Sequence, residues 1–400
     1  MFRFLLSIIL LFYTGCSAQD ENTLTVTMSL GEDEWNVLRS EIFPPFEKNH
    51  NIKIKSYQIE SGQLVTKLEA LQRAHKSEID VFAQDNMNLA PLIQKDLVLD
   101  LSPYEKEIAR AVLPNLINAC RFEKSLPFMP FRPNVQIIYF NAKAFKKYAL
   151  KPPKTWDELL KVAQIFRTKE GTGRILIKGY GGNATATQIY EFILQAGGNP
   201  YSFNDEGCVQ AFTFLQNLRP FLSPESQRAK WDTTNDILAR SEAYLAQNWP
   251  FGVTVLVKKY NLSFIKTYSG WSGPEREAHV IGGDVFGIPK NSKKKDLALQ
   301  FIFYMQSQSV QETLVSKLGW PSIRNDAYGQ VAQWQRAHFK SVQAALQHGA
   351  LREQVTWWPL YAKYVNAAFR EIVMDYSSVR ATLNKYKDEL ERAKEEYRKK

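Results

Sequence analysis

The order of strand and helix patterns after residue 22 restricts this chain to a small set of folds. Residues 24–30 alternate apolar and polar side chains and are rich in β-branched residues, which indicates a strand. Helical spacing follows over 37–46, then a strand at 52–57, a helix at 64–74 and a strand at 79–83. This alternation predicts a parallel, doubly wound α/β sheet. Ligands of such sheets bind at the carboxyl ends of the strands.

The length of 400 residues predicts two domains, because a single core stops growing at about 250–300 residues. A hydrophobic content of 44% and a charged content of 23% are ordinary for folded soluble domains. Aromatic residues make up 13% of the chain, including 9 Trp. Part of that excess suggests a ligand surface built from flat, amphipathic rings.

The formal charge of +10 does not by itself indicate a nucleic-acid partner. Lys and Arg are scattered, and the densest runs, 293–295 and 398–400, fall at an expected turn and at the terminus. We therefore expect a solvated basic surface and no nucleic acid.

The first sixteen residues read as an export signal. Arg3 precedes an apolar run over 4–13, which is too short to span a bilayer, and Thr14-Gly15-Cys16 matches the end of a lipobox. We expect residues 1–16 to form a lipoprotein signal peptide, with the mature chain exported and held at the membrane by lipid on Cys16. An ordinary cleavable signal is the alternative.

The remaining cysteines, Cys120 and Cys208, allow one disulfide, but two buried thiols are the favoured reading. Two cysteines cannot form a four-cysteine zinc site, and neither H-E-x-x-H nor G-x-S-x-G occurs. We expect no catalytic residues, no metal and no cofactor. A glycosidase-type pair of carboxylates stays open, because carboxylates are plentiful.

Five segments, in a common order, resemble those of the family 1 extracellular solute-binding proteins, the maltose- and trehalose-type binders. The strongest single match is Pro152-Pro153-Lys154-Thr155-Trp156, a helix start with Thr155 as its expected N-cap. The resemblance covers nearly the whole mature chain and is carried by residues 46–54, 78–101, 137–159, 243–250 and 286–322.

The resemblance implies an α/β, two-lobe periplasmic-binding-protein fold of type II, each lobe a doubly wound sheet flanked by helices, with a hinged cleft between them. One lobe would comprise residues 20–140 plus 287–322, and the other 141–286 plus 323–400. It also implies a monomeric, non-enzymatic component of an ABC importer. Such a protein closes on a small hydrophilic ligand, here expected to be a sugar, and delivers it to a membrane permease.

A sugar site needs aromatic platforms for C–H faces and charged or amide groups for hydroxyls. The resemblance assigns Asp85 as a ligand-binding acid and Trp249, expected after a helix, as a stacking ring. A helix N-cap and core packing are the respective alternatives. The further candidates, each with a structural alternative, are Glu34, Trp35, Asn134, Trp320, Arg324 and Trp358.

Two other functions stay open at this point. A binder of the same fold could take an anion or ferric ion, although no Tyr-Tyr pair of the kind used by ferric binders occurs. A surface enzyme that cleaves glycans is the alternative from another class.

Overall fold

The computed structural model describes residues 22–60 and 62–398. The predicted signal peptide and Cys16 therefore lie outside the described residues. None of the helices in the described part of the chain is both long enough and apolar enough to cross a membrane.

The predicted strand–helix alternation is confirmed at the start of the described chain. Strand β1 (Thr23–Met28) pairs in parallel with β2 (Lys53–Gln58) and β3 (Val81–Asp85). The intervening helices are α1 (Glu32–Val37), α2 (Phe43–His50) and α3 (Leu64–Arg73). The apolar side chains that set the patterns, such as Val26, Leu38 and Leu68, are buried in one core.

The first sheet has the order β10-β9-β3-β1-β2, with β4 also paired to β9. Strand β9 (His279–Gly287) runs antiparallel to both β3 and β4 (Met129–Val135), and parallel to β10 (Gly349–Leu351). The further helices of this lobe are α4 (Ala90–Gln94), α5 (Pro114–Asn118), α12 (Lys295–Met305) and α13 (Gln308–Thr313).

The second sheet has the order β6-β7-β5-β8, formed by Ile175–Leu176, Leu245–Asn248, Ile137–Asn141 and Ile265–Tyr268. Strand β5 is antiparallel to both of its neighbours. The helices of this part are α6 (Ala142–Lys147), α7 (Trp156–Glu170), α8 (Gly182–Gln195), α9 (Glu206–Leu218), α10 (Thr234–Ala239), α11 (Gly252–Thr254), α14 (Arg336–Gln347), α15 (Trp358–Phe369) and α16 (Val379–Arg398).

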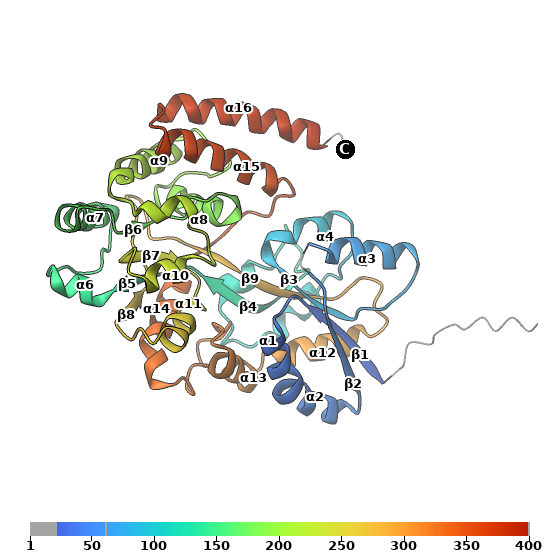
Figure 1. The fold of residues 1–400 in the computed structure, drawn as a ribbon. Coiled ribbons are helices and arrows are strands. Elements are labelled where there is room, and N and C mark those ends of the chain that lie inside the picture. Colours follow the sequence, from blue (N-terminus) through green and yellow to red (C-terminus); the bar gives the residue numbers. More distant parts are fainter. Residues whose placement is uncertain (1–21, 61, 399–400) are drawn as a thin grey trace, which may run out of the picture.

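The predicted N-cap of α7 is confirmed. The Thr155 hydroxyl accepts a hydrogen bond from the Glu158 backbone N–H at 3.2 Å and so caps α7. Leu383, Tyr386 and Leu390 form the buried stripe of α16, which packs against α9 and α15 at one edge of the molecule (Figure 1).

Strands β4 and β9 lie between the two groups of helices (Figure 1). The chain leaves the first sheet at the end of β4 and enters the second sheet at β5, with only Gln136 between them. On β9, Val280 packs in the second core, whereas the next residue, Ile281, packs in the first.

Strands β9 and β10 belong to the first sheet, although most of β9 and all of β10 fall in segments expected for the second lobe. Partners distant in sequence decide this, since β9 pairs with β3 about 200 residues upstream. The lobe limits themselves stay a prediction.

Cys120 and Cys208 are buried free thiols, one in each core, so the favoured reading of the cysteines is confirmed and the disulfide is not.

Candidate functional site

Two carboxylates lie opposite one another at the carboxyl end of β3, on interior strands of the first sheet. Asp85 ends β3 and lies opposite Asp284 of β9 in the antiparallel register. Asp85 Oδ1 also accepts the Met87 backbone N–H at 2.7 Å, which is the N-cap role considered as its alternative. Burial, and then the charge of Asp284, raises the pKa of Asp85, against the opposing charges of Arg352 and Arg132. An acid pair of this kind has unused capacity to accept hydrogen bonds.

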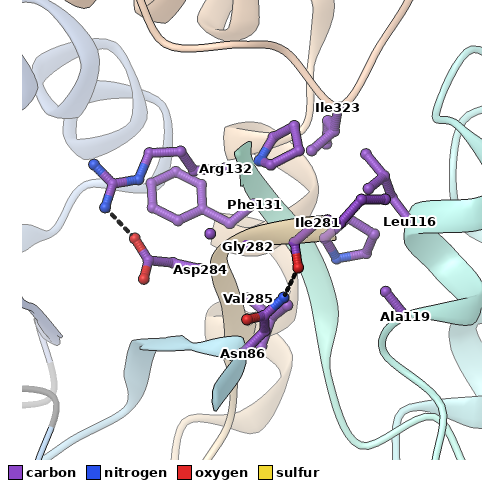
Figure 2. Close-up of a pocket in the computed structure, with 13 residues that line it drawn as sticks. Asn86, Leu116, Ala119, Phe131, Arg132, Ile281, Gly282, Asp284, Val285 and Ile323 are labelled. Carbon is purple, nitrogen blue, oxygen red and sulfur yellow. Dashed lines mark hydrogen bonds and ion pairs between the residues drawn. The ribbon is translucent and has the colours of Figure 1, made fainter. Parts of the chain in front are cut away.

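Arg132 links this acid pair to two residues predicted from sequence. Its guanidinium pairs with Asp284 (Figure 2). It also pairs, at 3.1 Å, with Glu34 Oε1. The Trp320 indole N–H donates to the same Glu34 oxygen at 2.9 Å, and Arg132 lies 4.3 Å from the centre of the Trp320 ring. Glu34 and Trp320, almost 290 residues apart in sequence, therefore belong to one charged and aromatic cluster.

Trp249 approaches the same strand from the second lobe. A Cβ atom placed on Gly282 would lie 2.9 Å from Cη2 of its indole, so the ring sits against the bare backbone of β9. Asn134 of β4 is the register partner of Gly282. The residues before Trp249 form β7, so the helix expected there is wrong: α10 ends at Ala239. Apolar residues 243–246 fit the centre of the second sheet better than a helix surface.

Arg352 and Trp358 complete the boundary between the lobes. Arg352 Nη2 donates to Asn86 Oδ1 at 3.1 Å, and its guanidinium lies 4.7 Å from the centre of the Trp358 ring. The Trp358 indole N–H donates to Asn183 Oδ1 at 3.0 Å. Met87, although it follows β3 of the first lobe, packs against the core of the second. The two lobes are thus in contact at this point.

Two small hollows share Asn86 and flank this contact. One lies along β4 and β9 beside Arg132 and Asp284, with Leu116 and Ile323 on its other side (Figure 2). The other is lined by Asn86, Met87, Trp358 and the segment 352–355. Together they mark the candidate cleft.

Two predicted site residues lie elsewhere. Trp35 is buried in the core of the first lobe, where its indole N–H donates to Gln58 Oε1 at 3.1 Å. Arg324 is buried and binds Asp326 through Nε and Nη2, at 2.8 and 2.7 Å. Trp35 is held by Gln58 of β2, and Arg324 also donates through Nη1 to the Gln306 carbonyl at 3.2 Å. Both side chains are thus bound by other parts of the protein, as expected for packing rather than for ligand contact.

Sequence reasoning missed Asn86, Arg132, Asp284 and Arg352 as site residues. Arg132 could have been found, because it shares a face of its strand with the predicted Asn134 two residues later. Trp231 and Phe251 were also missed; they are 51% and 40% exposed, and their rings meet edge to face at 6.0 Å beside the Trp249 loop. Adjacent exposed rings form an apolar patch, and such patches are common at binding surfaces.

Carboxylates, guanidinium groups and indole rings are brought together in this cleft, an arrangement suited to holding a hydroxylated guest. Within residues 22–60 and 62–398 there is no group of three or more His, Cys, Asp or Glu side chains that could hold a metal ion.

Residues 41–341 match the family model described as bacterial extracellular solute-binding protein. The chain belongs to this family. Among curated relatives, this solute-binding protein is 28% identical over 251 residues to a probable amino-acid ABC transporter periplasmic-binding protein, y4oP, of Sinorhizobium fredii. That match covers 59% of this chain and 54% of the relative, so the chain spans about half of that protein's length.

Solved structures confirm the two-lobed fold of the solute-binding protein. The sugar-binding protein MalE of Xanthomonas citri superposes with a TM-score of 0.81 at 18% identity, over 94% of this chain and 98% of that one. Maltose-bound MalE3 of Thermotoga maritima superposes with a TM-score of 0.73 at 18% identity, over 92% and 99% respectively.

Proposed function

We propose that this chain is the substrate-binding component of an ABC importer and that its ligand is a carbohydrate. It would capture the ligand between its two lobes, close around it by a hinge motion and deliver it unchanged to a membrane permease. The observation that carries the proposal is the meeting of polar and aromatic side chains from both lobes at one place. Asp85 and Arg132 come from the first lobe, and Trp249 and Trp358 from the second.

The chemistry of these groups favours a sugar. Indole rings pack on the C–H faces of pyranose rings, while carboxylate and guanidinium groups form charge-assisted hydrogen bonds to hydroxyls. The fold likeness to the MalE proteins supports the same reading. Because the curated relative y4oP is named as a probable amino-acid binder, the test below includes amino acids as a second ligand class.

The test is a thermal-shift screen of the purified mature chain against sugars, polyols, amino acids, inorganic phosphate and Fe(III), followed by calorimetry of each hit. We expect a sugar or polyol to bind with one-to-one stoichiometry and micromolar affinity, which corresponds to about −8 kcal/mol. Binding of only an amino acid, phosphate or Fe(III) would overturn the carbohydrate proposal. Turnover of a reducing-end-labelled oligosaccharide would overturn the proposal that the ligand is delivered unchanged.

We also propose that the protein is exported and lipid-anchored through Cys16. Incorporation of labelled palmitate into the wild-type chain, and its loss in Cys16→Ala, is the expected result. A soluble, unlabelled wild-type chain would favour an ordinary cleavable signal. Equal labelling of the two chains would place the lipid elsewhere.

A further inference from the structure

Arg352 is a buried charge whose donors are not all used. The residue is 7% exposed, and its Nε and Nη1 atoms are shielded from solvent and have no hydrogen-bond partner. Its one hydrogen bond is from Nη2 to Asn86, and it forms no ion pair with any residue that the structure describes. A buried guanidinium without a carboxylate partner is costly to the fold. Such a cost is typical of a group that acts on a ligand.

The surroundings of Arg352 place it where a ligand would reach it. It lines the small hollow between Asn86 and Met87 of one lobe and Trp358 of the other. Asp85 is the carboxylate with the largest electrostatic effect on Arg352, yet the two form no ion pair. Asp85 directly precedes Asn86, to which Arg352 donates, so a donor group and an acceptor group lie close to one another without being paired.

The charges around this region favour a neutral ligand over one that carries a carboxylate. Glu34, Asp85 and Asp284 supply three carboxylates, whereas Arg132 and Arg352 supply two guanidinium groups. The exposed Glu353 lines the hollow beside Arg352 and adds another negative charge at the rim of that hollow. A ligand carboxylate would add to this excess, while a hydroxyl can donate and accept at once.

We propose that Arg352 and Asp85 together hold hydroxyl groups of a neutral sugar, with Arg352 donating through Nε and Nη1 and Asp85 accepting. The cleft then selects uncharged polyhydroxylated ligands over sugar acids. This assignment rests on the proposed function and narrows its ligand class. Ligand enters when the lobes separate, and closure returns the guanidinium to a dry site in which its bonds to the sugar are strong.

The first test uses the wild-type protein alone. Calorimetry compares matched neutral and acidic sugars, D-glucose with D-glucuronate and D-galactose with D-galacturonate, together with the neutral sugars found in the screen. We expect the neutral member of a bound pair to bind at least tenfold more tightly. Equal or tighter binding of the acid overturns the assignment while leaving the carbohydrate-binding function intact. If no sugar binds, the proposed function itself fails.

The second test separates a ligand-binding Arg352 from a structural one. Arg352→Gln should weaken binding of the best neutral sugar by tenfold to a hundredfold, yet leave the melting temperature of the unliganded protein unchanged or higher. The matched control is Arg39→Gln, since Arg39 also lies over an indole, at 5.0 Å from Trp35, but away from the cleft. Unchanged affinity in Arg352→Gln, or a clear fall in its melting temperature, overturns the assignment.

Discussion

Asp85 and Asp284 occupy directly paired positions on neighbouring antiparallel strands, so that two carboxylates lie side by side at the lobe boundary. Like charges placed opposite one another destabilise a sheet. Arg132 offsets this in part through its ion pair with Asp284. Carboxylate oxygens that are not fully used within the protein can accept hydrogen bonds from a ligand. The closeness of the two carboxylates also makes the site sensitive to pH.

Asp85→Asn should stabilise the unliganded protein and weaken ligand binding. Asparagine can still accept the Met87 N–H but carries no charge to oppose Asp284. Because the pKa of Asp85 is raised above its ordinary value of 3.8, the folded state holds this proton more tightly, so this carboxyl costs stability as pH rises through the raised pKa. The gain in unfolding free energy of Asp85→Asn, measured by urea denaturation, should therefore grow from pH 4 to 7. A gain that does not change with pH would contradict the account.

Arg132 should contribute substantially to stability. Its side chain is 22% exposed and pairs with both Glu34 and Asp284, so Arg132→Met leaves two partly buried carboxylates without their partner. We expect a loss of about 3 kcal/mol in unfolding free energy. The control Arg73→Met removes a pair whose arginine is 75% exposed and should cost less than about 0.5 kcal/mol. Equal effects of the two substitutions in urea would argue against a structural role of the Arg132 cluster.

Two buried titratable groups near the lobe connections should oppose each other in their pH dependence. Burial lowers the pKa of Lys178 to about 7, only partly opposed by Glu191. Burial alone would lower the pKa of His279 too, but its ion pairs with Glu191 at 3.6 Å and Glu277 at 2.9 Å outweigh burial and raise the pKa to about 9. Lys178 donates at 2.6 Å to Gln136, the residue between β4 and β5, and His279 begins β9.

The signs of these two shifts predict cancellation. His279 contributes stability that is complete below pH 6.5 and is lost as pH rises to about 9, whereas Lys178 imposes a cost that is complete below about pH 7 and is relieved up to 10.5. Between pH 7 and 9 their contributions to the wild-type stability should offset each other.

Single substitutions should expose each slope. The stability of His279→Gln should rise with pH, and that of Lys178→Met should fall, each by up to about 1.4 kcal/mol per pH unit. Urea midpoints at half-unit pH steps give the comparison. Parallel profiles for the wild type and both variants would show that neither group titrates in this range.

Gly282 should be required for the position of the Trp249 ring. A methyl group at Gly282 would lie 2.9 Å from the indole, so Gly282→Ala should displace the ring and weaken sugar binding by about tenfold. At Gly62, which lies in a turn, nothing lies within 4 Å of an added Cβ, so Gly62→Ala serves as control and should bind as the wild type does. Unchanged sugar affinity in Gly282→Ala would argue that Trp249 does not contact the ligand.

The sequence predicted those parts of the fold that depend on local periodicity. Strands β1, β2 and β3 and the Thr155 cap follow directly from residue patterns. The insertion of β9 between β3 and β10 could not be predicted in the same way, because it depends on pairing with residues about 200 positions upstream and about 70 downstream.

The same distinction applies to the candidate site. Asp85 could be proposed because it ends a recognisable strand. Arg352 could not, because its place opposite Asn86 depends on how β10 joins the first sheet. Trp35 looks like a binding platform from its acidic neighbours, yet its helix turns the ring into the core.

The most direct test of the central claim is calorimetric titration of the best neutral sugar into the wild type and into Trp249→Ala, with recovery of the sugar afterwards by mass spectrometry. We predict one site per chain in the wild type, an affinity at least tenfold weaker in Trp249→Ala, and a sugar of unchanged mass. Equal affinity in the two proteins, or a chemically altered sugar, would contradict the account.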